Sequence, residues 1–136
     1  MKILLLILVL ATSLQADELL DVTWTLYEEA KGEPYRGIYA VASVIYTRSI
    51  ERDLTLSSVC RQRGQFSCWN SGREPRRYTN GEWSQCEQIA LSMTQRAFRP
   101  LSDWNHFFNP KKSRPYWARK LKNKKRIGNH IFGRLN

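Results

Sequence analysis

Three glutamates with the potential for acid–base chemistry lie in the stretch YEEAKGEPY, residues 27–35. Proline disfavours helical geometry in the residue before it, so a helix through this stretch should end at or before Glu33, with Gly32 suited to a left-handed terminus. Glu29 would then lie in or beside the last turn, where the negative end of the helix dipole favours a protonated carboxyl group. General acid catalysis requires such a neutral carboxyl group at the working pH.

The helical spacing separates the three glutamates. Glu28 is offset by about 100° from Glu29 and from the apolar stripe, so we expect it to face solvent. Glu29 and Glu33 are i, i+4 neighbours if the helix persists, and a like-charge pair raises the pKa of one member. The alternative, an acidic surface turn paired with Lys31 and Arg36, stays open on these residues alone.

Two helices should position this stretch. The spacing of Leu19 or Leu20, Trp24 and Tyr27 predicts a helix over residues 18–31, with acidic residues in its first turn. A second helix is predicted over residues 37–50, where one face repeats at i, i+3, i+4 intervals through Ile38, Val41, Val44, Ile45 and Arg48.

The rest of the chain is less periodic. Residues 59–83 are rich in Gly, Ser, Asn, Pro and Arg, which predicts irregular loops with one or two short strands. A third helix is predicted over residues 84–98 with Ser84 as its cap. The aromatic alternation of WNHFFNP, residues 104–110, predicts an extended segment, and a short helix is expected over residues 116–121.

The first sixteen residues, MKILLLILVLATSLQA, have the layout of a secretory signal: a lysine, an apolar run and a small-residue end. We expect cleavage after Ala16, export to the periplasm or the exterior, and one domain over residues 17–136. The run is short for a bilayer span of about 20 residues, and a retained membrane anchor is the alternative.

The chain has a formal net charge of +10, and its residues 111–126, KKSRPYWARKLKNKKR, contain nine basic residues and no acidic one. Such a segment concentrates near polyanions. Nucleic acid, anionic membrane and cell-wall polymers all qualify, and a solvated face that only confers solubility is the alternative.

The cysteines Cys60, Cys68 and Cys86 form an odd set. One pair of them could form a disulfide in an oxidising compartment, and the sequence leaves the pairing open. No CxxC or HxxxH spacing occurs, so we expect no metal site. No motif indicates a cofactor.

Five stretches in order resemble the SleB-like cell-wall hydrolases, a family that includes spore cortex-lytic enzymes and phage lysis enzymes. They are YEEAKGEPYRGIYAVASVIYTRS, VCRQRGQFSCW, HFFNP, PYWARKL and IGNHIFGR, and they span most of residues 25–134. The resemblance implies an α+β, mainly helical, lysozyme-like single domain with a small loop-and-strand lobe beside the cleft.

The same resemblance implies cleavage of the glycan of peptidoglycan, with Glu29 as the catalytic acid and Glu33 in support. Further substrate-binding candidates come from the middle loop and the HFFNP block: Gln65, Phe66, Trp69, His106 and Asn109. Phe66 and Trp69 equally suit the core of the small lobe. The anionic wall or an outer-membrane surface would bind residues 111–126; we expect a monomer and no specific nucleic-acid partner.

The number of carboxylates separates two reactions. Hydrolysis of a glycosidic bond normally uses two flanking carboxyl groups, and beyond Glu33 the candidates for a partner are Asp53 and Asp103. A lytic transglycosylase needs one, and the family resemblance favours this reaction over hydrolysis by a muramidase. The rival from another class is a non-catalytic basic module that binds nucleic acid or acidic glycans.

Overall fold

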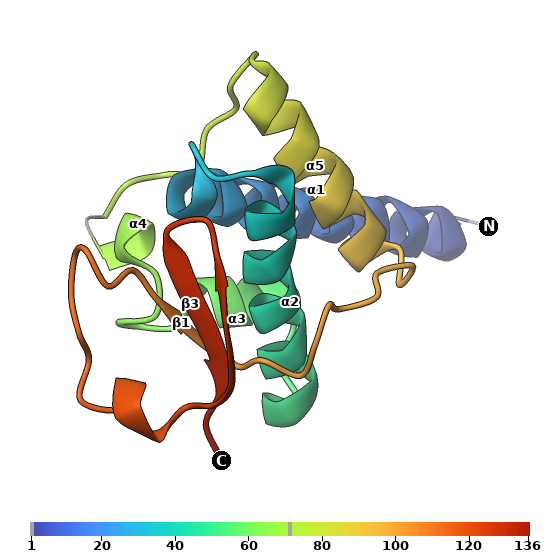
Figure 1. Cartoon of the computed structure of the whole chain (residues 1–136). Helices are drawn as coiled ribbons and strands as arrows, with labels where there is room; N and C mark the ends of the chain where they lie inside the picture. Colours follow the sequence, from blue (N-terminus) through green and yellow to red (C-terminus); the bar gives the residue numbers. More distant parts are fainter. Residues whose placement is uncertain (1, 71) are drawn as a thin grey trace.

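The fold is a helical body with a small antiparallel sheet at one end, seen in a computed structural model that describes residues 2–70 and 72–136. Helix α1 (Lys2–Ala30) is central and packs against α2 (Tyr35–Arg52), α3 (Leu56–Arg61) and α5 (Gly81–Thr94). Figure 1 shows these helices gathered around α1, with the sheet beside α2. The lysozyme-like, mainly helical α+β class expected from the sequence is confirmed.

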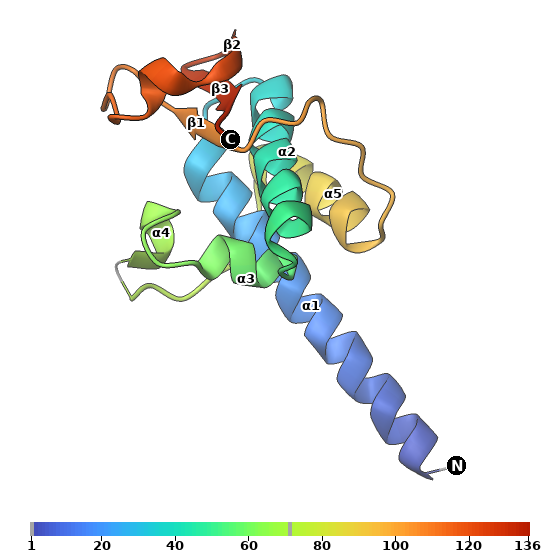
Figure 2. The same cartoon turned by 90° about the horizontal axis from the view of Figure 1, so that it is seen from below.

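The second half of α1 is the core of the molecule. Its side chains are buried on every face from Asp21 to Tyr27, and Trp24 and Leu26 are fully buried. The first half projects away from the body in Figure 2, and the apolar side chains of Ile7 to Leu10 are exposed there. In the described part of the chain, no helix combines the length and the apolar character needed to cross a bilayer.

Helix α1 ends where the proline rule predicts. The backbone N–H of Lys31 donates to the Tyr27 carbonyl at 3.0 Å, and Gly32 has a φ of +82°. This left-handed conformation costs glycine little and other residues much more. Pro34 then caps α2, whose buried face includes Ile38, Val41, Val44, Ile45 and Arg48, as the spacing predicted.

The middle of the chain differs from the prediction. Residues 59–83 contain no strand in their described part; they contain the end of α3, the single turn α4 (Ser67–Asn70) and the start of α5. Helix α5 begins at Gly81, where the side chain of Asn80 accepts a hydrogen bond from the Trp83 N–H at 2.8 Å, so Ser84 as the cap was wrong. The helix ends at Thr94, before Arg96, which has a positive φ of 59°.

The strands come from the end of the chain. They are β1 (His106–Phe108), β2 (Lys122–Ile127) and β3 (His130–Arg134), in the antiparallel order β1-β3-β2. The predicted extended segment contains β1, and the predicted short helix is reduced to the 3-10 turn Ala118–Lys120. The sequence did not predict β2 or β3. Strand β2 reads KNKKRI, a basic run of low strand propensity.

The three cysteines are all buried, and no disulfide joins Cys60 to Cys86 in the described part of the chain. Burial is the largest cause of the raised thiol pKa values of both, which lie at about 12. Cys60 and Cys86 therefore act as apolar core residues.

Candidate active site

One cleft of about 420 Å³ contains most of the candidate residues. Helices α1 and α2, the loop before α4, strand β1 with the loop after it, and strand β3 all contribute to its walls. The lining residues are Glu28, Glu29, Arg48, Gly64, Gln65, Ser67, His106, Phe107, Phe108, Asn109, Lys112, Ser113, Pro115, Trp117 and His130. A larger hollow of about 780 Å³ lies between α1, α2 and α5, but Glu29 is not among its lining residues.

Glu29 lies in the last turn of α1 and opens into this cleft. Burial raises the pKa of its carboxyl group to about 7. Hydrogen bonding to the Ser67 backbone and the positive charges of Lys112 and Arg48 oppose this rise, whereas the charge of Glu28 adds to it. A carboxyl group with such a pKa is present in both protonation states near neutral pH, which suits a group that gives and then takes a proton.

The largest cause of the raised pKa of Glu29 differs from the two expected from the sequence, which were the helix dipole and a like-charge pair with Glu33. Burial in the folded cleft, rather than a like-charge pair with Glu33, is the main reason that Glu29 holds its proton. The carboxylate that adds to the rise is Glu28, the neighbour assigned to solvent. Periodicity along one helix cannot reveal burial by segments that are distant in the sequence, such as those that carry Ser67 and Lys112.

The expected solvent position of Glu28 was wrong. Its side chain is only 8 % exposed, and it forms ion pairs with Arg73 at 3.0 Å and Lys31 at 3.4 Å. The hydroxyl group of Tyr78 also donates to it, at 3.4 Å. Glu28 thus holds the loop before α5 against the end of α1, and both of its oxygens have partners.

Glu33 does not line the cleft. Its buried carboxylate accepts a hydrogen bond from the Asn129 N–H at 3.1 Å and lies 3.5 Å from Nδ1 of His130. It therefore binds the turn between β2 and β3. Since His130 does line the cleft, Glu33 supports one cleft wall from outside the cleft.

The middle-loop candidates separate into two groups. Gln65 lines the cleft, whereas Phe66 is 1 % exposed and belongs to the core. Trp69 packs edge-on against Trp24, and its Nε1 donates to Thr25 Oγ1 at 2.9 Å. The structure therefore favours the packing role for Phe66 and Trp69 and leaves Gln65 available to a ligand.

His106 and Asn109 both line the cleft from β1 and the residue after it. Burial, together with the charges of Arg48 and Arg52, lowers the pKa of His106 to about 4, so its ring is neutral near pH 7. The backbone carbonyl of Asn109 accepts from the N–H groups of Lys112 and Ser113, at 3.0 Å each. Asn109 thus shapes the loop that carries Lys112 to the cleft.

Sequence reasoning missed Arg48 and Lys112 as site residues. Arg48 is 6 % exposed, its Nε donates to the Asn105 carbonyl at 2.8 Å, and its Nη1 has no hydrogen-bond partner among the described residues. Burial lowers the pKa of Arg48 to about 10, which leaves it charged. A charged residue at an apolar helical position was the available signal for Arg48; Lys112 was one of many basic residues.

The candidates for a second carboxylate lie elsewhere. Asp53 lines the larger hollow, and Asp103 lies 3.7 Å from Arg134 on another face. Among the described residues, the carboxylates that line the cleft are therefore Glu28 and Glu29.

This arrangement, a lysozyme-like α+β fold with a buried glutamic acid in a polar cleft, is that of a glycan-cleaving enzyme. The chain belongs to the Cell Wall Hydrolase family, whose sequence model matches residues 32–133. Peptidoglycan is accordingly its substrate. The match begins at Gly32, so Glu29 lies just before the matched residues.

Two solved structures are similar to this chain. The catalytic domain of the germination-specific lytic transglycosylase SleB from Bacillus anthracis superposes with a TM-score of 0.70 at 26 % identity, over 86 % of this chain and 93 % of that one. The catalytic domain of the Bacillus cereus SleB protein gives a TM-score of 0.71 at 26 % identity, over 88 % and 91 %. No protein of curated function matches the sequence. The resemblance to SleB-like cell-wall hydrolases is confirmed.

Proposed function

We propose that this protein is a lytic transglycosylase that cuts peptidoglycan between N-acetylmuramic acid and N-acetylglucosamine, with Glu29 as its acid and base. One observation carries the assignment: Glu29 lines the cleft, and burial raises its pKa to about 7. The similar SleB catalytic domain of B. anthracis is described as a lytic transglycosylase, which supports the same reaction here.

The reaction balances without water. Protonated Glu29 gives its proton to the glycosidic oxygen as the bond from C1 of the muramic acid to that oxygen breaks. The resulting carboxylate then takes the proton from the C6 hydroxyl group of the same sugar, and O6 bonds to C1 to close the anhydro ring. Lys112 and Arg48 lower the pKa of Glu29, so they stabilise the carboxylate that exists between the two steps.

The carboxylate count favours this route over hydrolysis by a muramidase. A hydrolase would need a second carboxylate to bind the nucleophilic water or to attack the sugar. Glu28 is the other carboxylate among the described cleft residues, and its oxygens are held by Arg73, Lys31 and Tyr78. It is therefore poorly placed to act as that group.

Mass spectrometry of digested peptidoglycan tests the reaction. Anhydro-muramic ends are expected in the products; reducing ends that have gained water would establish the muramidase instead. Cut peptides with intact glycan would overturn both.

Replacement of Glu29 tests the residue. Glu29→Gln should lower the clearing rate of purified sacculi by several orders of magnitude, because an amide cannot donate the proton. Glu87→Gln is the matched control, since Glu87 lies on α5 with a side chain that is 43 % exposed. Equal clearing by the Glu29 variant and the parent would remove Glu29 from the mechanism, whereas no clearing by either protein would favour the non-catalytic basic module.

We further propose that residues 111–126 hold the enzyme on the anionic wall or on a phosphate-rich outer-membrane surface. The strand β2 supports this proposal, because its side chains from Lys122 to Arg126 are all exposed and four of the five are basic. Sedimentation with sacculi should weaken as salt rises. A variant with Lys122, Lys124 and Lys125 changed to Gln should lose most of that binding, and salt-independent binding would contradict the proposal.

Export is part of the proposed function, since the substrate lies outside the cytoplasm. The signal-like layout of residues 1–16 supports it. N-terminal sequencing of the protein recovered from the periplasm should begin at Asp17; a retained Met1 would favour the anchored form. Size-exclusion chromatography with light scattering should give a monomer.

A further inference from the structure

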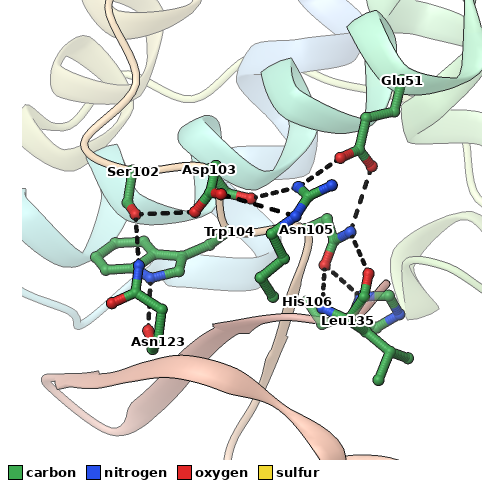
Figure 3. A network of polar contacts seen from close by, with 9 residues as sticks. Glu51, Ser102, Asp103, Trp104, Asn105, His106, Asn123 and Leu135 are labelled. Carbon is green, nitrogen blue, oxygen red and sulfur yellow. Dashed lines mark hydrogen bonds and ion pairs between the residues drawn. The ribbon is translucent and has the colours of Figure 1, made fainter.

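The side-chain amide of Asn105 has a fixed orientation. Its Oδ1 accepts a hydrogen bond from the Leu135 N–H at 2.8 Å, and its Nδ2 donates to the Leu135 carbonyl at 2.8 Å and to Glu51 Oε2 at 3.3 Å. A backbone N–H only donates and a carbonyl only accepts, so the two ends of the amide cannot be exchanged. Figure 3 shows this group of contacts, with Asn105 between Glu51, Leu135 and His106.

This orientation determines the tautomer of the neighbouring histidine. Nδ1 of His106 lies 2.9 Å from the same Oδ1 of Asn105. Because a carbonyl oxygen can only accept, Nδ1 must carry the hydrogen. A neutral imidazole has one hydrogen on its two nitrogens, so Nε2 of His106 keeps a free lone pair.

That lone pair is available at the cleft. Nε2 has no hydrogen-bond partner in the described part of the chain. It is not fully buried either, so a ligand can reach it. His106 lines the cleft, so its accessible nitrogen is reached from there. Trp117 packs edge-on against the ring, with centroids 4.8 Å apart, and limits its rotation.

The charges around the ring keep it an acceptor. The guanidinium groups of Arg48 and Arg52 disfavour the imidazolium form, and burial does so more strongly, while Glu51 opposes them. The cleft groups Arg48 and Lys112 can only donate hydrogen bonds. An unprotonated nitrogen among such donors recognises an O–H or N–H group of a ligand.

We infer that His106 binds the glycan by accepting a hydrogen bond at Nε2 from a hydroxyl or acetamido N–H of an N-acetyl sugar, and that Asn105 is the positioning residue that fixes its tautomer. The substrate class in this inference rests on the proposed function; the tautomer does not. The two parts therefore fail separately.

Nitrogen-15 NMR of the free protein tests the tautomer. The chain has two histidines, so a His130→Gln variant assigns the spectrum. His106 should show a protonated Nδ1 and an unprotonated Nε2 at pH 7. Asn105→Ala should shift the ring toward the Nε2–H form or a mixture, whereas Asn123→Ala, which removes an exposed contact to Ser102, should not. A protonated Nε2 in the parent would overturn the inference, whatever the products of the enzyme are.

Ligand binding tests the second part. In the Glu29→Gln background, a purified glycan tetrasaccharide of alternating N-acetylglucosamine and N-acetylmuramic acid should move the Nε2 resonance of His106 and leave Nδ1 nearly unchanged. In the active enzyme, Asn105→Ala should raise KM about tenfold, by loss of about one net hydrogen bond, with a smaller change in kcat. An unmoved Nε2 resonance at saturating glycan would overturn the binding role. A Glu29→Gln enzyme that stays active would overturn the proposed mechanism alone.

Discussion

The carboxylate of Glu33 accepts a hydrogen bond from the backbone N–H of Asn129 at 3.1 Å, although 96 residues separate the two in sequence. This contact joins the segment after α1 to the turn between β2 and β3. The turn itself fits tightly: a Cβ atom on Gly128 would lie 2.0 Å from Glu33 Oε2 and 3.1 Å from Pro34 Cδ. The wall of the cleft that carries His130 thus depends on a glycine outside the cleft.

Gly128→Ala should therefore destabilise the protein by more than its backbone conformation explains. Gly128 has a φ of +60° and Gly72 a φ of +67°, but a Cβ on Gly72 would meet nothing within 4 Å. Both variants incur left-handed strain of about 1 kcal/mol, and the overpacking at Gly128 adds about 2 kcal/mol. Urea unfolding measures the difference. Equal losses would contradict the contact, and Glu33→Ala in the Gly128→Ala background should recover part of the larger loss.

The pH profile of kcat/KM should fall as pH rises through about 7, because the first step needs protonated Glu29. A single group with this pKa gives about tenfold less activity at pH 8 than at pH 6. Initial rates on solubilised glycan strands across pH 5–9 measure the profile. A flat profile over this range would show that another group donates the proton.

The same pKa predicts how the stability of the protein changes with pH. The folded protein holds a proton on Glu29 up to about pH 7, whereas the unfolded chain releases it near the ordinary value of 4.5. This group's contribution is thus fully present below pH 4.5, and falls as pH rises from there to 7. Glu29→Gln removes the buried charge, so at pH 8 it should stabilise the protein by up to about 3 kcal/mol. At pH 4 the difference between the variant and the parent should vanish in chemical denaturation.

Two adjacent lysines offer a matched test of the cleft electrostatics. The charge of Lys112 lowers the pKa of Glu29, so Lys112→Gln should shift the alkaline limb of the activity profile to higher pH. The neighbouring Lys111 is exposed, does not line the cleft, and has its Nζ 3.4 Å from Asn129 Oδ1. Lys111→Gln should leave the limb in place, and equal shifts in both variants would indicate a general surface-charge effect.

Local sequence rules predicted the part of the site that lies on one helix terminus. Gly32 and Pro34 fixed the end of α1 within one residue, and with it the place of Glu29. The buried face of α2 followed from its spacing, including Arg48. These features depend on neighbours within a few residues, where helix geometry determines which side chains share a face.

Features that depend on distant segments were not predictable in this way. Glu28 looked like a solvent residue because its partner Arg73 lies 45 positions away. Strand β2 looked like a solvated basic tail because its own residues give no sign of its pairing with β3. The Nδ1–H tautomer of His106 depends on the orientation of the adjacent Asn105 amide, which Leu135 holds from 30 positions away.

The sheet order β1-β3-β2 has a consequence for the synthesis of the protein. The strand that pairs with both others is the last of the three in sequence. A nascent chain that has reached residue 127 contains both outer strands but not the central one, and Asn105 still lacks Leu135. The wall of the cleft that carries His130 can therefore form only after β3 has been synthesised. A translation product that stops before His130 therefore lacks the central strand of the sheet and one wall of the cleft.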